Sequence, residues 1–507
     1  MRNAFLLMLA FLAYSLTTSA QVMADEQPDL PEFSLNQAQL QGQMYWLASD
    51  YLAGRRTGSP GNEIAAEYIA SQLRGFGYEP INGDSYFQDV PMVSIKGPTR
   101  ASLKIDKTAY EHGEDLLIMR GPALGNTKAK VVYAGYGWVD EENDHDDYAN
   151  LDVEGKIVVT RPGIPGEPGQ SGIFKGVRSK AEIAAERGAV AVFEFYQLPF
   201  PWSAFKGYFG GDRLSLAGDD DEGSPIPYGF LNINETTIGN ITTAIKPLKG
   251  EVMSGGMDQT PVNSRNIGGI LRGSDPELAD EYMIMTAHMD HVGVGEQGGG
   301  AYTEQDSIFN GSRDNAFGTI ALLSAARCFA EKTPRRSIII LAVTGEELGL
   351  LGSQYYANNP LVPLDQTVYN FNVDGAGYND VNAISTFGGG RTGVEAEVQA
   401  AADLFDFKIY NNPAPEQGLY DRSDNVSFAQ KGIPAITFTE GFDDFDDDIM
   451  QYYHQVTDNP NSIDYEYLRK FCVAYTYAAR LIADRDERPF WIEGDKYEEA
   501  GLELYNR

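Results

Sequence analysis

The segment EYMIMTAHMDH, residues 281–291, is a short apolar run that ends in a polar side chain, His288. Two later segments repeat this pattern: SIIILAVTGEELG at 337–349 and TVYNFNVDGAG at 367–377, the last of which reaches Asp374. Short β-rich runs bounded by glycine or polar residues predict central strands. In open α/β sheets, ligands gather beyond the carboxyl ends of such strands. We therefore expect an α/β fold with its polar residues along one rim of the sheet.

Potential metal ligands follow one another along the chain in the order His-x-Asp, Asp, Glu-Glu, Asp, His. Zinc binds imidazole nitrogen and carboxylate oxygen at about 2.0–2.2 Å. Two such ions, roughly 3.5–4 Å apart, can share one carboxylate and one water. We expect two Zn²⁺ per chain, bridged by Asp314. One ion would also take His288 and Asp374, and the other Glu347 and His454.

The remaining polar residues of these segments have other expected roles. Adjacent side chains on an extended or turning segment point in different directions, so Glu346 and Glu347 are not expected to serve the same ion. We predict Glu346 as the general base that takes a proton from the attacking water and passes it to the leaving amine. Asp290 is expected to accept the second ring N–H of His288. His291 is predicted to orient the loop or line the cleft, not to bind metal.

Each of these patterns also has a purely structural interpretation. A His-x-Asp pair is often only hydrogen-bonded, Asp314 can cap a helix, and Asp374 can form a turn with the glycine that follows. The ordered set favours a dinuclear metal centre, because the structural interpretation requires several independent coincidences.

The chain resembles the M28 family of zinc metallopeptidases in six ordered blocks: TAHMDHVG (286–293), SRDNAFG (312–318), TGEELGLLGS (344–353), NVDGAG (372–377), DRSDNVSFAQKGIPAITF (421–438) and YYHQVTD (452–458). The resemblance implies a three-layer zinc-exopeptidase fold with a mixed central sheet, the same ligands, and Glu346 as the base. It adds Tyr453 as a group that helps to hold the oxyanion, and a cis peptide between Asp314 and Asn315. Phe317 and Asn425 depart from the family's commoner residues, which leaves substrate preference open.

The region between the first helices and the first metal ligand has a different character. Short strands such as GKIVVTRPG alternate there with Gly/Pro-rich turns, and the stretch resembles a protease-associated domain. We predict a signal peptide at 1–24, the first part of the peptidase domain at 25–114, a protease-associated domain inserted at 115–248, and the main catalytic part at 249–507.

The net charge and the N-terminal hydropathy pattern bear on the partners and the cellular location of the protein. The 507 residues include 73 acidic and 39 basic ones, a net charge of −34, which disfavours nucleic acid and anionic membranes as partners. The basic start and short apolar run of residues 1–20 are typical of a cleavable signal peptide, so we expect a secreted or periplasmic protein. The acidic cluster 219–222 is expected to be a solvated loop, whereas the one at 442–448 could recognise an ammonium group or a basic side chain. Pairing of Cys328 with Cys472 stays open, as does the oligomeric state.

These features favour a two-zinc exopeptidase, most simply an aminopeptidase acting on peptides with a free N-terminus. Specificity would depend on the loops 416–426 and 440–452 and on the inserted domain. A carboxypeptidase of this fold would need basic groups for the substrate carboxylate, for which Arg313 and Arg422 are the candidates. An M20-type peptidase would need a dimerisation domain after the Glu pair, where this chain has no insertion. A receptor-like relative would have lost ligands, and a glutaminyl-cyclase-like transferase remains a further alternative.

Overall fold

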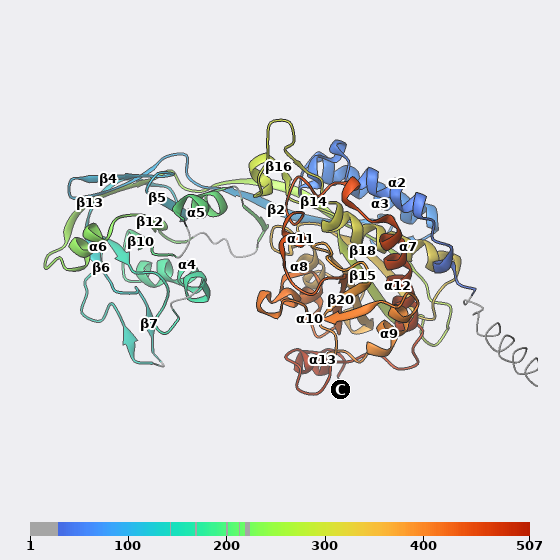
Figure 1. The fold of residues 1–507 in the computed structure, drawn as a ribbon. Helices are drawn as coiled ribbons and strands as arrows, with labels where there is room; N and C mark the ends of the chain where they lie inside the picture. Colours follow the sequence, from blue (N-terminus) through green and yellow to red (C-terminus); the bar gives the residue numbers. More distant parts are fainter. Residues whose placement is uncertain are drawn as a thin grey trace, which may run out of the picture. The chain divides into compact units, whose positions relative to one another are not determined.

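The structure, a computed structural model, contains two compact units (Figure 1). Unit 1 comprises Met1–Gln88 and Arg265–Arg507, and unit 2 comprises Asp89–Ser264. The residues described are 29–141, 143–167, 170–198, 201–211, 213–218 and 224–506. The predicted signal peptide and the acidic cluster 219–222 lie outside the described residues.

Unit 1 is built around a mixed sheet. Strand β18 lies parallel to β15, β15 to β19, and β19 to β22, whereas β14 pairs with β18 and β20 with β22 in antiparallel fashion. β21 lies parallel to β20, and β1 (Glu79–Pro80) pairs with β14. In sheet order the strands are β14 (Asp258–Leu271), β18 (Ser337–Val343), β15 (Tyr282–His288), β19 (Thr367–Val373), β22 (Ala435–Glu440), β20 (Ala383–Phe387) and β21 (Lys408–Asn411).

Helices cover both faces of this sheet, which explains why its strands are apolar along their whole length. Successive side chains of a strand point to opposite faces: in β15, Met283 and Met285 pack in the core of one face and Ile284 in that of the other. The first face carries α2 (Gln37–Leu47), α3 (Pro60–Phe76), α7 (Gly318–Glu331), α9 (Glu395–Asp403) and α12 (Tyr465–Ala483). The second carries α8 (Leu351–Asn358) and α10 (Asn425–Ala429). The expected three-layer α/β fold is thus confirmed.

Local signals explain where the second N-terminal helix begins and ends. The side chain of Ser59 accepts a hydrogen bond from the backbone N–H of Asn62, and Pro60 occupies the first turn of α3, where its missing N–H costs no helical hydrogen bond. Gly77, at φ 88°, ends the helix in the left-handed conformation that glycine adopts without strain. Between α2 and α3 lies a short 3₁₀ segment, η2 (Asp50–Arg55).

Unit 2 has its own eight-stranded sheet with an apolar core on each face. Unit 2 extends beyond the predicted range 115–248 at both ends. The reason is that β3, β4 and β13 hydrogen-bond into its sheet and therefore belong to unit 2. Its strand order is β4 (Thr108–Glu111), β3 (Ala101–Ile105), β13 (Leu248–Ser254), β6 (Leu124–Tyr133), β9 (Lys156–Thr160), β10 (Ala191–Phe195), β12 (Tyr228–Leu231) and β5 (Leu116–Arg120). Its helices are α4 (Gln170–Ala185), α5 (Trp202–Phe209) and α6 (Glu235–Thr242).

Smaller elements complete the fold. Strand β2 (Phe87–Lys96) pairs with β11 (Arg213–Leu216), β7 (Val139–Asp140) with β8 (His145–Asp146), and β16 (Gly293–Val294) with β17 (Ile308–Phe309). The C-terminal part of the chain adds α11 (Asp447–Met450) and α13 (Glu498–Leu504).

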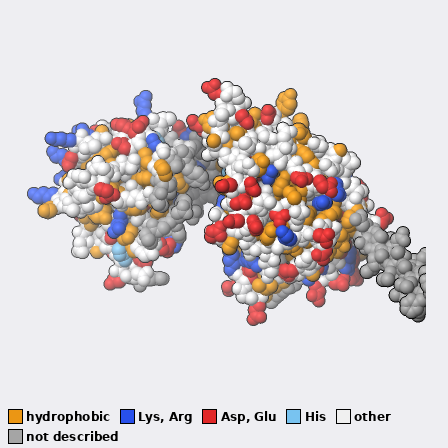
Figure 2. Space-filling view, in the orientation of Figure 1, with side chains coloured by type: hydrophobic (Ala, Val, Ile, Leu, Met, Phe, Trp, Pro, Cys, Tyr) orange, Lys and Arg blue, Asp and Glu red, His pale blue; other side chains and the backbone are white. Residues whose placement is uncertain are grey.

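Two features concern the surface of the protein and its relation to membranes. On the face shown in Figure 2, acidic side chains gather over unit 1. In the part of the chain that the structure describes, none of the helices combines the length and the apolar character needed to cross a bilayer.

Both cysteines are free and buried, and burial raises the pKa of each thiol to about 12. We expect a thiol reagent such as DTNB to label neither cysteine in the native protein and about two thiols per chain after unfolding. Labelling of the unfolded protein only after reduction would show instead that Cys328 and Cys472 form a disulfide.

Candidate metal centre

Polar residues at or just after the ends of three parallel strands, β15, β18 and β19, lie at one edge of the unit 1 sheet. His288 is the last residue of β15 and lies in register with Val343, the last residue of β18. Glu346 and Glu347 follow β18, and Asp374 follows β19 directly. Because parallel strands end at the same edge, residues far apart in sequence meet there.

Asp314 and His454 reach the same place from loops. Asp314 lies in a short π-helical turn, η4 (Ser312–Phe317), at the start of α7, and its peptide bond to Asn315 is cis, as the family resemblance implies. The carboxylate of Asp458 accepts hydrogen bonds from the backbone N–H groups of Arg313 (3.0 Å) and Asp314 (3.4 Å). Asp458 lies four residues after His454, so it links the turn of Asp314 to the loop of His454.

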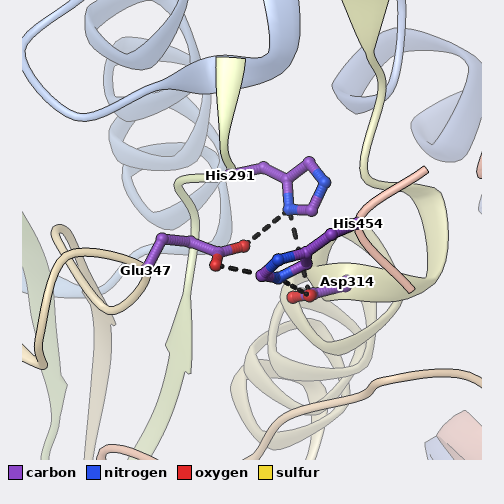
Figure 3. A group of neighbouring side chains, drawn as sticks. All are labelled: His291, Asp314, Glu347 and His454. Carbon is purple, nitrogen blue, oxygen red and sulfur yellow. Dashed lines mark hydrogen bonds and ion pairs between the residues drawn. The ribbon is translucent and has the colours of Figure 1, made fainter. Parts of the chain in front are cut away.

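The five predicted ligands form two clusters that share Asp314. In the first, His288 Nε2 lies 3.0 Å from Asp374 Oδ1 and 3.3 Å from Asp314 Oδ1. In the second, His454 Nε2 lies 3.0 Å from Glu347 Oε2 and 3.2 Å from Asp314 Oδ2 (Figure 3). Asp314 therefore presents one oxygen to each cluster.

This geometry suits zinc. Two ligand atoms bound tetrahedrally at about 2.0–2.2 Å from one ion lie roughly 3.4 Å apart. The separations of 3.0–3.3 Å within each cluster are close to this value. Imidazole nitrogens and carboxylate oxygens are also the donor types that zinc takes in catalytic sites.

His291, which the sequence did not predict as a ligand, also lies in the second cluster (Figure 3). Its Nδ1 lies 2.7 Å from Glu347 Oε1, the oxygen that does not face His454, and 4.0 Å from Asp314 Oδ2. A separation of 2.7 Å is a hydrogen bond, so His291 is placed to fix the rotation of Glu347. The short spacing between His288 and His291 is the signal in the sequence that could have placed His291 at the same site.

The contacts of Asp290 differ from the prediction. His288 Nδ1 lies 3.2 Å from the backbone oxygen of Asp290 and 3.9 Å from its carboxylate. The carboxylate instead accepts hydrogen bonds from the Thr57 hydroxyl (2.9 Å) and the backbone N–H of Glu346 (3.3 Å). The turn after β15 directs the carbonyl toward the ring and the side chain toward Glu346, so Asp290 positions both residues by different groups.

Buried charges shift the pKa values of the site in opposite directions. Burial and the neighbouring Asp374, Glu347 and Asp424 raise the pKa of Glu346 well above its usual value, although His288 opposes them. Burial and Asp314 would raise the pKa of Glu347, but His454 and His291 lower it to about 2.

The two histidines of the clusters respond to the same charges. Burial alone would lower the pKa of His454, but Glu347 and Asp314 raise it to about 11. The pKa of His288 is likewise raised well above its usual value against the effect of burial, by Asp374 and Glu346 and by its hydrogen bond with Asp314. In the metal-free protein the surrounding carboxylates therefore favour the protonated form of both imidazoles.

Tyr453 lies beside this centre. Its ring stacks on His454 with 4.2 Å between centroids and meets the ring of Phe445 edge-on at 5.4 Å. Burial, Asp314 and Glu347 raise the pKa of Tyr453, so its hydroxyl keeps its proton and can act only as a neutral donor.

A buried polar chain that the sequence did not reveal holds Asp374. The Ser423 hydroxyl donates to Asp374 Oδ2 at 2.5 Å, and the side-chain amide of Asn372 donates to Ser423 at 2.8 Å. Asn372 in turn accepts a hydrogen bond from Thr286 in the neighbouring strand at 2.6 Å. The sheet itself thus orients a predicted ligand.

The two residues that depart from the family pattern are structural. Phe317 is buried and packs edge-on against Phe471, with 5.0 Å between ring centroids. Asn425 is buried, donates to the Tyr420 carbonyl and accepts from Thr437. In the described contacts neither residue touches the predicted ligands.

A family model and the curated relatives agree on the kind of protein that this chain resembles. Residues 266–478 match the model of peptidase family M28. The chain is 28% identical over 252 residues to a probable zinc metalloprotease of Leptosphaeria maculans, covering 44% of this chain and 55% of that protein. It is 26% identical over 274 residues to aminopeptidase YwaD of Bacillus subtilis, covering 52% and 56%. The chain thus spans about half the length of these curated relatives.

A solved structure shows the same fold. The aminopeptidase from Aneurinibacillus sp. strain AM-1 superposes with a TM-score of 0.60 at 20% sequence identity, covering 89% of this chain and 95% of that one.

Because an imidazole must lose its proton to bind zinc, we expect zinc binding at pH 7 to release protons from His288 and His454. Below the pKa values of both histidines, apparent zinc affinity should rise with pH, by up to about 100-fold per unit. Titration calorimetry in buffers of different ionisation enthalpy measures the release. A His288→Gln variant should release about one proton fewer, whereas His112→Gln in unit 2 should match the wild type.

Proposed function

We propose that the peptidase M28 domain at residues 266–478 makes this chain a dinuclear zinc aminopeptidase. The observation that carries the proposal is the position of Asp314, whose two oxygens lie 3.3 Å from His288 and 3.2 Å from His454, one in each cluster. Such a carboxylate is placed to bridge two ions, with His288 and Asp374 on one side and Glu347 and His454 on the other. The names of the curated relatives, a zinc metalloprotease and an aminopeptidase, support the same activity.

The chain's own residues supply the proton transfers. When bound, the zinc pair would lower the pKa of a shared water and polarise the scissile carbonyl. Glu346 accepts a proton from the attacking water and delivers it to the leaving amine. Burial raises the pKa of Glu346 in the metal-free site, and bound zinc would favour the carboxylate form that accepts the proton. The protonated hydroxyl of Tyr453 donates a hydrogen bond to the developing oxyanion.

Three neighbouring residues keep this arrangement in place. His291 holds the outer oxygen of Glu347, Ser423 holds Asp374, and Asp290 holds the backbone of Glu346. Each of these hydrogen bonds restricts a ligand or the base to one orientation. Partners of this kind commonly tune metal affinity and activity as much as the ligands themselves.

The surroundings of Arg313 favour an aminopeptidase over a carboxypeptidase. Its buried guanidinium lies 4.2 Å from the ring centroid of Tyr378 and 3.8 Å from that of Tyr452, and it donates to the Ser462 carbonyl at 2.8 Å. These contacts hold it in the interior, away from a substrate carboxylate. Of the two basic candidates, only the exposed Arg422 remains available.

The substrates proposed are peptides with a free N-terminus, and the loops 416–426 and 440–452 would set the preference among them. Asn379, from another segment, donates to Asp443 and Asp446 of the second loop. The aspartates at 443–448 of this loop are exposed, whereas Glu440 is buried. Secretion or periplasmic export, by a signal peptide at residues 1–24, and a protease-associated role for unit 2 complete the proposal.

Replacing the proposed base tests the chemistry. Glu346→Gln removes the proton acceptor while keeping the size of the side chain, so kcat should fall by about 10²–10⁴-fold with two zinc ions still bound. Metal content by atomic emission and steady-state kinetics measure both. The exposed Glu277→Gln is the matched control and should behave like the wild type. Near-normal turnover in Glu346→Gln would exclude Glu346 as the base.

A panel of substrates tests whether the enzyme removes the N-terminal or the C-terminal residue of a peptide. Aminoacyl-nitroanilides should be hydrolysed, and the same compounds with an acetylated amine should not, because a blocked amine cannot bind as an ammonium. Peptides carrying a C-terminal reporter test the alternative. Cleavage of these alone, lost in Arg422→Ala, would establish a carboxypeptidase instead.

A further inference from the structure

We propose that Arg55, in the turn between α2 and α3, is a positioning residue of the metal centre. Its guanidinium fixes the loop of His288–His291 against the turn that carries Asp314. This inference rests on the proposed metal centre and assigns a function to a segment more than 200 residues before the first ligand.

The guanidinium of Arg55 binds backbone carbonyls from three separate segments. Nε donates to the oxygen of Met289 at 2.9 Å, one residue after His288. Nη1 donates to Asn310 at 2.6 Å and Nη2 to Gly311 at 2.8 Å, just before the turn of Asp314. Nη1 also donates to Leu47 at the end of α2, at 2.7 Å. One side chain therefore ties both ligand loops to the helical layer.

The backbone conformation at Gly54 and Arg55 allows the turn to approach the ligand loops closely. Gly54 lies at φ 66° and Arg55 at φ 44°, both in the left-handed region. A Cβ at Gly54 would lie 2.3 Å from the oxygen of Gly293 and 2.6 Å from that of Phe309, so only glycine allows the turn to come this close. A left-handed arginine is unfavourable on its own and persists where the surroundings hold it.

Further hydrogen bonds connect the same turn to the proposed base. The backbone oxygen of Arg55 accepts from the backbone N–H of His291 at 3.4 Å and from the Asn62 side chain at 3.2 Å. Thr57 donates to the carboxylate of Asp290, which accepts from the backbone N–H of Glu346. The turn thus contacts the segments of the base and of both clusters.

The charge of Arg55 suits this position. It is 1% exposed, and burial lowers its pKa to about 10, although Asp458, Asp314, Asp290 and Glu347 act to raise it. It therefore stays protonated at neutral pH beneath a group of carboxylates. Lysine would keep the charge but lose the planar fork that reaches three segments at once.

The test compares Arg55→Lys with Arg336→Lys. Arg336 is an equally buried arginine of unit 1, whose guanidinium binds Glu281 and the carbonyl of Ala483 away from the described site contacts. Zinc affinity is measured by competition with a chromophoric chelator, thermal stability by calorimetry, and kcat and KM on an aminoacyl-nitroanilide.

Arg55→Lys should weaken zinc binding by about 10–100-fold and lower kcat more than it changes KM. Arg336→Lys should lose stability but keep the zinc affinity of the wild type. If Arg55→Lys folds and binds zinc as tightly as the wild type, the inference is overturned. If the wild-type chain itself binds no zinc, the proposed function fails with it.

If Arg55→Lys fails to fold without metal, refolding in excess zinc distinguishes a positioning role from a general structural role. Zinc and the guanidinium organise the same loops, so saturating zinc is expected to restore the fold. Failure at every zinc concentration would assign Arg55 a general structural role and overturn the inference.

Discussion

The proposed metal centre depends on one carboxylate that faces two imidazoles at once. Asp314 has His288 beyond one oxygen and His454 beyond the other, at 3.3 and 3.2 Å. A carboxylate on a flexible loop would not hold this orientation. Here the backbone N–H of Asp314 donates a hydrogen bond to Asp458, and η4 leads into α7, so the fold itself sets the position of the proposed bridge.

The second constraint is charge. Asp290, Asp314, Glu347 and Asp458 are buried or largely buried around one another, and carboxylates without compensation are costly in such surroundings. In the metal-free protein, the buried guanidinium of Arg55 provides compensation, and the carboxylates favour the protonated forms of His288 and His454. Zinc would replace the two imidazole protons with a larger charge, so the same carboxylates that destabilise the metal-free site favour metal binding.

Unit 2 has an interior of its own and contributes none of the five predicted ligands. Two apolar cores flank its sheet, and a fully buried ion pair of Lys180 and Glu194 lies within it, with the Tyr228 hydroxyl donating to the carboxylate at 3.1 Å. Unit 2 therefore has a core of its own, and in the sequence it lies between the turn of Arg55 and the first proposed ligand.

Residue patterns along the chain predicted the strands that end at His288 and before Asp374, the order of the proposed ligands and the class of fold. Those features follow from local residue type and periodicity. The packing of distant segments was needed to show that His291 holds Glu347, that the Asp290 carboxylate binds Glu346 and not His288, and that Arg55 reaches Met289, 234 residues away. It also set the limits of unit 2, because strand pairing between β3 and β13 joins residues that no local pattern connects. Hydrogen bonds between distant segments depend on how the layers pack, and a linear pattern of residue types does not contain that distance information.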